Sequence, residues 1–502
     1  MEVFITISFL ILISVLLLWL ANKGNKSVHK VPPGPWKLPM IGNLHQLVGS
    51  SLPHHALRTL AEKHGPLMHL QLGEISAVIV SSPNMAREIM KTHDLAFAER
   101  PEFLPSKIIV YGSTDIAFAP YGEYWRQMRK ICTLELLSSK KVHSFSYIRQ
   151  EEVANMVETI FKSAGGTVNL SKMINNLIST VVSRAVFGNL SQDHEQFVSF
   201  VKKTIALSDG FDLADLFPSF KPLHFITGME AKLYKMHVKI DQILDKIIKE
   251  IEERKLEDNT QHEQQEKNEN LVEVLLRVLR SGTLDTPITI NNVKAVIWDI
   301  FSAGTDTSGV VIEWVMSELM RNPRAMKKAQ AEIRHALRGK QTIQEADVAE
   351  LPYLKAVISE TMRLHPPLPL LLPRQARQDC TINGYHIPIN TKVMVNVYAL
   401  GRDPHYWHDA ETFLPERFQD TPMDFKGTNF EYIPFGAGRR MCPGLNFGLA
   451  NVEFALAMLL YHFNWELPKG MKAEDLDMNE AQGAVVGRKN NLYLIPTLSH
   501  YS

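Results

Sequence analysis

The apolar residues of this chain begin with one long run at the N-terminus. Residues 1–20 read MEVFITISFLILISVLLLWL, in which Glu2 is the only charge, and Lys23, Lys26 and Lys30 follow. A run of about 20 apolar residues can cross the hydrocarbon core of a bilayer, whereas a cleaved signal peptide has a basic start and a shorter apolar stretch. We therefore predict a transmembrane signal anchor over residues 1–21, with the lysines keeping the rest of the chain cytosolic.

Proline replaces the apolar pattern directly after this run. Residues 31–47 read VPPGPWKLPMIGNLHQL, and proline stiffens an extended chain by fixing φ. The sequence thus predicts a basic, proline-rich strap over residues 22–45 that leads into one globular domain over residues 46–502. No internal repeat and no interior linker rich in glycine, serine or proline divides that domain.

Within the domain, the spacing of apolar residues predicts strands first and helices afterwards. Alternation within residues 67–82 indicates short strands and hence a small sheet. From about residue 81 to residue 279 the spacing of three and four indicates mainly helices. Residues 252–270 are charged and poor in apolar side chains, which predicts an exposed connecting loop. The expected fold class is mainly α with a small β region, preceded by one N-terminal transmembrane helix.

A second long apolar segment, residues 289–322, predicts a helix that crosses the domain. Thr289 is the candidate N-cap, and a proline directly after the segment ends it. Its middle reads AGTDT, in which the glycine weakens the helix and the Thr307 hydroxyl can donate to the carbonyl oxygen of Ala303. These residues predict a groove in the helix at this point.

Composition narrows the classes of partner. Lys+Arg and Asp+Glu are equal at 54 each, so no excess of positive charge favours nucleic acid. Cys132, Cys380 and Cys442 are odd in number and far apart, which argues against a disulfide framework and against the paired ligands of a zinc site. This cysteine usage fits a reducing compartment.

The most specific pattern is the decapeptide FGAGRRMCPG at residues 435–444. A lone cysteine is most often an ordinary buried thiol. Here glycines flank Cys442 and let the backbone turn sharply beside a flat macrocycle, while the start of the next helix favours a thiolate. A cysteine thiolate pushes electron density through a haem iron. The decapeptide therefore predicts that Cys442 ligates haem iron, with Phe435 and Gly444 shaping the loop. Arg440 is available to pair with a propionate.

Further charged and aromatic residues support such a site. Glu360 and Arg363 share a helix face at a spacing of three and, with Arg417, form a predicted buried ion triad of structural importance. Three other side chains are candidates for propionate contacts. They are Trp125 and Arg129, four apart on a predicted helix, and Arg374, which follows a predicted apolar strand.

The ordered set of WRQMR, AGTDT, ETMR, PERF and FGAGRRMCPG resembles the cytochrome P450 superfamily of haem-thiolate monooxygenases. The segments PPGPWKLPMIGNLHQL and EYWRQMRKICTLELLS are most similar to the microsomal plant type and to its terpenoid-oxidising subgroup. The resemblance implies haem b (iron protoporphyrin IX) between the long helix and the cysteine loop. It implies electrons from NADPH through a partner flavoprotein reductase, with O2 and a small apolar substrate that is hydroxylated or epoxidised. It also implies a single-pass protein of the endoplasmic reticulum membrane with its catalytic domain in the cytosol.

The resemblance also assigns roles to individual residues. Asp306 and Thr307 would deliver protons toward bound oxygen. The residues implied to line the substrate space are Ile109, Phe211, Ala303, Thr307, Leu370, Leu371, Ala484 and Val485. Gln375-Ala376 and Gly487 depart from the subgroup's usual residues at the rim, so the substrate stays undefined.

Other functions on this scaffold remain open. One is an alkaloid or flavonoid hydroxylase. A second is a reductase-independent haem-thiolate isomerase or dehydratase, and a third is a non-catalytic, membrane-anchored haem carrier. The acid and alcohol pair at residues 306–307 counts against the second and the third, because neither needs a proton path.

Overall fold

The computed structural model describes most of the chain beyond its N-terminal segment. The described ranges are 30–47, 49, 52–188, 194–208, 213–220, 227–257, 269–340, 342–419, 423–468 and 470–499. The predicted anchor over residues 1–21 and the predicted lining residue Phe211 lie outside these ranges. Within them, no helix has both the length and the apolar character that crossing a bilayer requires.

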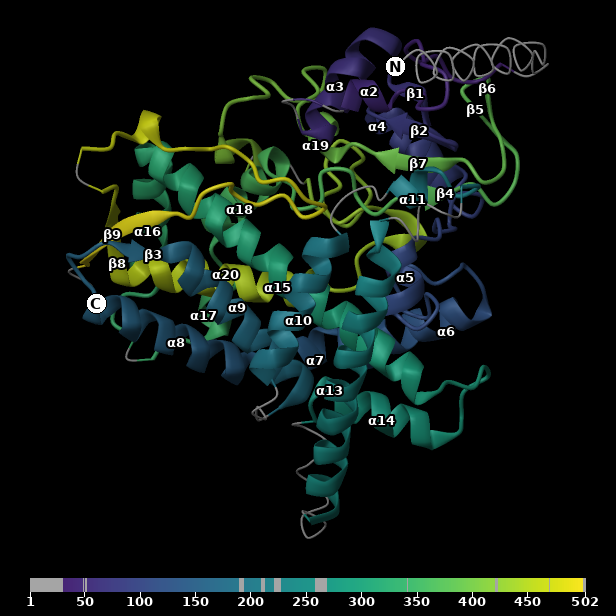
Figure 1. Ribbon diagram of the computed structural model, residues 1–502. Helices are drawn as coiled ribbons and strands as arrows, with labels where there is room; N and C mark the ends of the chain where they lie inside the picture. The colour runs from purple at the N-terminus through teal and green to yellow at the C-terminus, as the bar shows by residue number, and fades with distance from the viewer. Residues whose placement is uncertain are drawn as a thin grey trace, which may run out of the picture.

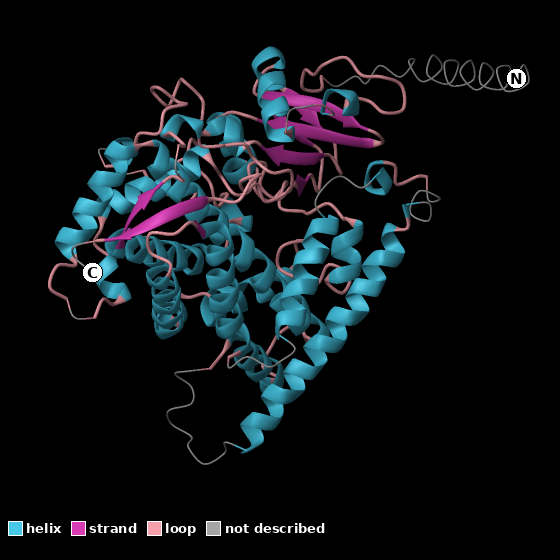
Figure 2. Cartoon of the chain, turned by 60° about the vertical axis from the view of Figure 1, so that its left-hand side comes forward, coloured by secondary structure: helices cyan, strands magenta, loops and turns pink. Residues whose placement is uncertain are grey.

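Helices form most of the molecule, with a small sheet at the end nearest the N-terminus (Figure 1, Figure 2). The first group is α2 (Leu44–Leu47), α3 (Pro53–His64), α4 (Pro83–Arg87), η1 (Glu88–Thr92), α5 (Leu104–Ile109), α6 (Glu123–Ile131), η2 (Cys132–Leu136), α7 (Ser139–Ser144), α8 (Ser146–Lys162) and α9 (Leu170–Phe187). The second is α10 (His194–Ser208), α11 (Leu213–Leu216), α13 (Met229–Glu257), α14 (Leu271–Ser281), α15 (Ile290–Arg321), α16 (Pro323–Ala336) and α17 (Glu345–Val348). The third is α18 (Pro352–Leu364), α19 (Val397–Leu400), η4 (Pro415–Phe418), η5 (Gly438–Arg440), α20 (Leu445–His462) and η6 (Ala473–Asp475).

The strands form three small sheets. They are β1 (Leu67–Leu72), β2 (Ile75–Val80), β3 (Val168–Asn169), β4 (Arg374–Gln375), β5 (Cys380–Ile382), β6 (Tyr385–Ile387), β7 (Lys392–Val395), β8 (Phe463–Glu466) and β9 (Tyr493–Leu498). The sheet orders are β1-β2-β7-β4, β3-β9-β8 and β5-β6. The fold is therefore mainly α with small β regions, as the sequence predicted.

The largest sheet joins segments from the two ends of the chain. β1 and β2 form an antiparallel hairpin whose turn contains Gly73 at φ +61°. Most side chains of both strands are apolar and buried. β7 pairs parallel to β2, with Val80 opposite Val395. The strands predicted within residues 67–82 are confirmed, and their partner comes from the C-terminal part of the chain.

The long apolar segment forms the central helix, α15. It lies between Thr289 and Asn322, as predicted, and packs against α9, α18 and α20. Thr289 is the N-cap residue, but its hydroxyl bonds no helix N–H. Instead, the side-chain oxygen of Asn292 accepts the Thr289 N–H at 2.7 Å. Most side chains of α15 are buried, which explains why the segment is apolar on nearly all sides.

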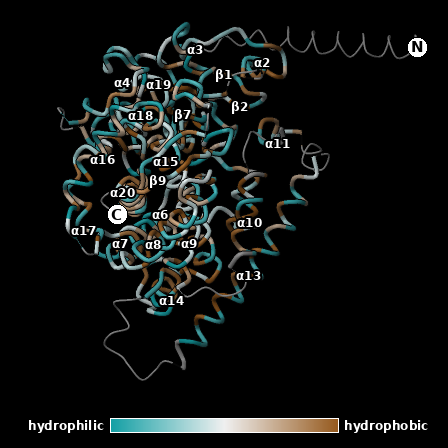
Figure 3. Tube along the Cα trace, turned by 90° about the vertical axis from the view of Figure 1, so that its left-hand side faces the viewer, coloured by the Kyte–Doolittle hydropathy of each residue, from teal (hydrophilic) through white to brown (hydrophobic). Residues whose placement is uncertain are grey.

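The surface helix α13 shows a different pattern. In Figure 3 hydrophobic and hydrophilic stretches alternate along it. Its buried side chains include Leu233, Ile240, Leu244 and Ile251, which recur at helical spacing. The helix continues to Glu257, so residues 252–257 of the predicted loop over residues 252–270 are helical, and residues 258–268 lie outside the described ranges. Glu, Lys, Arg and Leu are strong helix formers, and their charge alone did not end the helix.

The described part of the predicted strap packs on the sheet. The His69 N–H donates to the Pro33 carbonyl oxygen at 2.8 Å. A Cβ on Gly34 would lie 2.0 Å from the His69 carbonyl oxygen, so only glycine permits this approach. The Asn43 side chain accepts the Gln71 N–H at 2.8 Å. This part of the strap is therefore bound to the globular body.

A half-buried carboxylate connects α3, α15 and α18 to the C-terminal loop. Glu480 Oε2 lies 2.8 Å from His54 Nε2 and 3.0 Å from His55 Nε2. His365 lies between the two acids, with Nδ1 3.9 Å from Glu480 Oε1 and Nε2 2.7 Å from Glu318 Oε1. Burial alone would raise the pKa of Glu480, but hydrogen bonds from the three histidines hold that pKa well below its usual range. We call these five residues the glutamate–histidine cluster.

Candidate functional site

The cysteine of the decapeptide lies in a tight loop between η5 and α20. The Cys442 N–H donates to the Phe435 carbonyl oxygen at 3.0 Å, which closes the loop. Gly438 has a φ of +69°, and a Cβ there would lie 2.2 Å from the Met90 carbonyl oxygen. Because only glycine fits this position, the motif lets the loop pack directly against η1.

The Cys442 thiol combines exposure to solvent with surroundings that disfavour its charge. Its side chain is accessible to solvent, yet it lies deep enough that burial raises the pKa of the thiol. The Gly444 N–H bonds the sulfur, and this bond and the charge of Arg129 act in the opposite direction by favouring the thiolate. A donor is therefore already aimed at the sulfur. The helix begins at Leu445 with Gly444 at its N-cap, so Cys442 lies just before the N-terminus of α20.

The first turn of α20 packs against the middle of α15. A Cβ on Gly304 would lie 3.8 Å from the ring of Phe447, and one on Gly448 would lie 3.6 Å from Ser308 Oγ. Small residues thus bring the two helices into direct contact. This contact places the AGTDT segment of α15 beside the loop that carries Cys442.

One face of α15 is open at this segment. The Thr307 hydroxyl donates to the Ala303 carbonyl oxygen at 2.7 Å, which confirms the predicted back-bond. Ala303 is exposed, and Asp306, Thr307 and Val310 are half-buried, in a helix that is otherwise mostly buried. α15 stays continuous here, so the predicted groove is not a break in the helix. Accessible side chains of α15 therefore lie beside the loop that carries Cys442.

Two arginines predicted to contact propionates are fully buried. Arg374 Nη1 lies 2.7 Å from Asp94 Oδ1, and its Nη2 donates to the Ala437 carbonyl oxygen at 2.7 Å. Arg440 donates to carbonyl oxygens of the segment 98–119, and its guanidinium stacks 4.3 Å from the centroid of the Trp125 ring. Both side chains therefore connect the cysteine loop to the segment before α6.

A further buried arginine, Arg100, was not predicted from the sequence. Its Nε donates to the Ala117 carbonyl oxygen at 2.9 Å, and its Nη1 donates to the Leu372 carbonyl oxygen at 2.7 Å. The available signal was a charged pair, Glu99-Arg100, directly after the apolar residues Phe97-Ala98. Arg129, on α6, completes the group by donating to the Met441 carbonyl oxygen at 2.5 Å. We call Arg100, Arg129, Arg374 and Arg440 the arginine cluster.

The arginine cluster carries more positive charge than its surroundings neutralise. Burial lowers the pKa of Arg100, and repulsion by Arg440 and Arg374 lowers it further. Burial also lowers the pKa of Arg440 to about 10. Many of their hydrogen bonds go to backbone carbonyls, which carry no net charge. A dianionic group would be stabilised here, and the two propionates of haem b meet that requirement. The residues present therefore fit haem.

The segment before Arg374 differs from its prediction. Residues 365–373 form turns, and β4 begins only at Arg374. The apolar stretch HPPLPLLLP contains several prolines, which cannot donate to a strand ladder, and Leu371 has a φ of +52°. The predicted apolar strand is therefore wrong.

The predicted lining residues occupy several segments. Leu370, Leu371 and Val485 are half-buried, and Ala484 is exposed. The Val486 N–H donates to the Pro367 carbonyl oxygen at 2.9 Å, which holds their two loops together. Ile109 differs, because it is 3% exposed and belongs to the main core.

The three residues of the predicted ion triad are in contact. Arg363 Nε and Nη2 lie 2.7 and 2.8 Å from the two oxygens of Glu360, and Arg417 Nε lies 3.0 Å from Glu360 Oε1. The Leu414 N–H also donates to that oxygen at 2.8 Å. Glu360 is fully buried. The triad therefore fastens η4 to α18.

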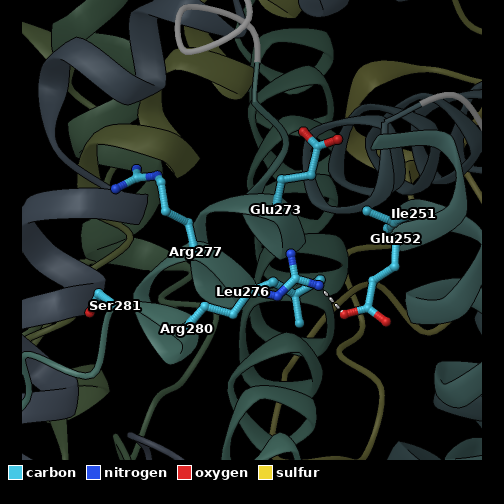
Figure 4. A pocket seen from close by; sticks show the side chains of 7 residues that line it. All are labelled: Ile251, Glu252, Glu273, Leu276, Arg277, Arg280 and Ser281. Atoms are coloured by element: carbon cyan, nitrogen blue, oxygen red, sulfur yellow. Dashed lines mark hydrogen bonds and ion pairs between the residues drawn. The ribbon is translucent and has the colours of Figure 1, made fainter. Parts of the chain in front are cut away.

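A surface pocket of about 350 Å³ lies elsewhere, between α13 and α14 (Figure 4). Figure 4 shows Glu252 bonded to Arg280 across it, while Glu273 and Arg277 point in other directions. None of its lining residues belongs to the site described above.

Comparisons with known proteins agree with this geometry. A family model described as Cytochrome P450 matches residues 32–495. Premnaspirodiene oxygenase of Hyoscyamus muticus is 52% identical over 99% of this chain and 97% of its own length. Germacrene A hydroxylase of Barnadesia spinosa is 51% identical over 99% and 98%, and desmethyl-deoxy-podophyllotoxin synthase of Sinopodophyllum hexandrum is 54% identical over 97% and 96%. A solved zebra fish cytochrome P450 with progesterone has a TM-score of 0.76 and 25% identity, covering 89% of this chain and 100% of that chain.

Proposed function

Because the chain belongs to the cytochrome P450 family and is a haem-dependent monooxygenase, we propose that it oxidises a small apolar terpenoid with Cys442 as the iron ligand. The observation that carries this proposal is the Cys442 thiol, which is accessible to solvent, receives the Gly444 N–H and lies beside Arg129 of the arginine cluster. Haem held there supplies activation of O2 and transfer of one oxygen atom to a C–H or C=C bond.

The protein's own residues prepare this chemistry. The Gly444 N–H and Arg129 favour the thiolate form of Cys442. The arginine cluster would hold the propionates of haem and so orient the macrocycle. On α15, the Thr307 hydroxyl stays bound to the Ala303 carbonyl oxygen while its lone pairs can accept from water, and Asp306 lies beside it for proton exchange.

The substrate class rests on relatives and on the chemistry of the lining residues. Premnaspirodiene and germacrene A, in the names of two relatives, are terpene hydrocarbons. Ala303, Leu370, Leu371, Ala484 and Val485 are apolar, partly open side chains on three segments. Such a surface selects by shape and offers few hydrogen bonds, so an apolar terpenoid is the guest that we propose.

We also propose that electrons come from a membrane-bound NADPH-dependent flavoprotein reductase and that the chain resides on the endoplasmic reticulum. The apolar run of residues 1–21 supports membrane attachment. Trp36 and Met40, at the start of the globular body, are 67% and 70% exposed, which leaves apolar surface available for lipid.

The test combines spectroscopy with product analysis. Reduced protein under carbon monoxide should show the red-shifted thiolate band, and Cys442→Ala should lose it while Cys380→Ala keeps it. Microsomes that contain reductase should then convert sesquiterpenes, and few alkaloids or flavonoids, to products heavier by one oxygen. Turnover of alkaloids alone would contradict the terpenoid assignment. Product formation without NADPH and reductase would instead indicate an isomerase or dehydratase.

A further inference from the structure

A short loop between α5 and α6 is held by a carboxylate of the central helix. The Asp299 Oδ2 atom on α15 accepts the Ile116 N–H at 2.7 Å and the Ala117 N–H at 3.1 Å. Asp299 is 8% exposed and lies one helical turn before the open face that begins at Ala303. The central helix thus fixes two consecutive peptide groups of this loop.

The carbonyl oxygens of the same loop face the arginine cluster. The Ile116 carbonyl oxygen accepts from Trp125 Nε1 at 3.0 Å and from Arg440 Nη1 at 3.4 Å. The Ala117 carbonyl oxygen accepts from Arg100 Nε at 2.9 Å. The peptide group between Ile116 and Ala117 is bound by Asp299 at its N–H and by Trp125 and Arg440 at its carbonyl oxygen. The next peptide group is bound by Asp115 at its N–H and by Arg100 at its carbonyl oxygen. The position of the arginines therefore depends on the position of Asp299.

A second carboxyl group meets Asp299 inside the protein. Asp115 is fully buried, and its Oδ2 accepts the Phe118 N–H at 3.1 Å. Its Oδ1 has no N–H or hydroxyl donor among the described residues, and the carboxyl groups of Asp115 and Asp299 lie within hydrogen-bond distance of each other. Two carboxyl groups hydrogen-bond each other only when one of them carries a proton.

We propose that Asp115 and Asp299 share one proton, and that Asp299 is a positioning residue that holds the arginine cluster in place for the haem propionates. The second half of this proposal rests on the haem placement proposed above. The first half concerns the protein alone and is tested without haem chemistry.

The shared proton has a consequence for stability at alkaline pH. Burial raises the pKa of Asp115 to about 6, although the hydrogen bonds from Asp299 and the Phe118 N–H act to lower it. Burial and the charge of Asp115 raise the pKa of Asp299 well above its usual value. The groups that face the pair are Arg100, Arg440, Tyr124 and Cys132. The unfolded carboxyls titrate near 3.8, so the folded pair binds more protons than the unfolded chain at higher pH. The stabilising contribution of the pair is complete below that value. It declines as pH rises through about 6, where Asp115 titrates, and declines further at higher pH, where Asp299 titrates.

Three variants and one control test the proposal. Asn at position 299 can accept the two loop N–H groups and donate to Asp115, so Asp299→Asn should release haem to apomyoglobin no more than about twofold faster than the parent. Asp115→Asn can donate to Asp299 in the same way and should also retain haem. Asp299→Ala loses the acceptor and should release haem about tenfold faster. The control is Glu313→Ala, which removes a half-buried carboxyl from α15 that bonds Ser171, and it should release haem like the parent.

Thermal unfolding of the same holoproteins at about pH 6 and about pH 8.5 measures the shared proton. The parent should lose stability at the higher pH, and Asp299→Asn should lose less. If Asp299→Ala retains haem as well as Glu313→Ala does, Asp299 is no positioning residue. If Asp299→Asn keeps the full alkaline loss, or releases haem as fast as Asp299→Ala, no proton is shared. If Cys442→Ala keeps the thiolate band, the haem placement is wrong. The unfolding measurement then tests the shared proton by itself.

Discussion

Two threonines on α15 make the same hydrogen bond and have different surroundings. The Thr307 hydroxyl donates to the carbonyl oxygen of Ala303, and the Thr305 hydroxyl donates to that of Phe301, each at 2.7 Å. Thr305 is 4% exposed, whereas Thr307 lies on the open face. The back-bond is therefore a property of threonine in a helix. Any catalytic contribution belongs to the position of Thr307.

Thr307→Ala should lower the ratio of product formed to NADPH consumed by about tenfold, because a positioned hydroxyl no longer assists proton transfer. The measurement is product, NADPH and released hydrogen peroxide in one reconstituted assay. Thr305→Ala is the matched control and should leave this ratio unchanged. Equal ratios in the two variants would remove Thr307 from the proton path.

The residues of the site differ in how far the sequence reveals them. Cys442 and its glycines lie within one decapeptide, and the local backbone geometry requires glycine at fixed positions. The motif was therefore visible in the sequence. Arg100 and Asp299 act through carbonyl and N–H groups of a loop that the fold brings to them. Neither contact leaves a spacing that a linear pattern shows. Arg100 and Asp299 were therefore not predicted from the sequence.

Among the elements, η4 and α18 depend on the Glu360 ion triad. Glu360→Gln would leave the guanidiniums of Arg363 and Arg417 without their shared charge in a dry environment. Removing one partner of a buried ion pair costs about 3–5 kcal/mol, so the free energy of unfolding should fall by an amount of that order. Denaturant titration of purified protein measures it.

An exposed ion pair gives the control for this prediction. Glu158 and Lys162 form an i,i+4 pair on α8 with an N···O distance of 2.8 Å, and both side chains are largely exposed. Glu158→Gln should leave the unfolding midpoint unchanged because solvent screens such a pair. A Glu360→Gln variant as stable as Glu158→Gln would contradict the structural role of the triad.

The glutamate–histidine cluster predicts a dependence of stability on acid. The pKa of Glu480 is depressed in the folded state relative to its usual value of 4.5. Its stabilising contribution is therefore present above that pH and is lost progressively below it. Glu480→Gln should lower stability at neutral pH by about 2–3 kcal/mol, and the difference from the parent should shrink as the pH falls below 4.5.

Thermal unfolding across this pH range measures the effect. Glu474→Gln is the control, because Glu474 lies in the same C-terminal region and is 75% exposed. It should follow the parent at every pH. A constant difference between Glu480→Gln and the parent at all pH values would show that Glu480 acts by packing and not by charge.

Helices and strands were predictable where apolar residues formed a long run or alternated with polar residues. α15 was found within one residue at each end because its apolar run, N-cap and terminating proline agree. The partner of β2 was not predictable, since parallel pairing joins segments that no local pattern connects. The stretch at residues 365–373 was misjudged because its apolar composition resembled a strand while its prolines prevented one.

At the scale of the whole molecule, the exposed apolar residues near the described N-terminus predict a second membrane contact. A chain that lacks residues 1–21 should still bind phospholipid vesicles weakly. Trp36→Ser with Met40→Ser should reduce that residual binding by about tenfold or more, since burying each apolar side chain contributes about 1.5–3 kcal/mol. Co-sedimentation with vesicles measures the bound fraction.

Leu134→Ser provides the control, because Leu134 is 57% exposed and belongs to η2, far from Trp36 in the sequence. This variant should bind vesicles like the truncated parent. Equal loss of binding in both variants would indicate general surface hydrophobicity and not a defined lipid contact.

The parallel pairing of β2 with β7 also bears on how the protein is made. A ribosome completes the β1-β2 hairpin early, and β7 emerges only when most of the polypeptide has been synthesised. During that interval one side of β2 lacks its final neighbour, and an open strand edge can recruit other nascent chains. Products of premature termination before Lys392 retain this edge for good. Holdase chaperones that bind extended apolar segments should therefore act on the hairpin during translation.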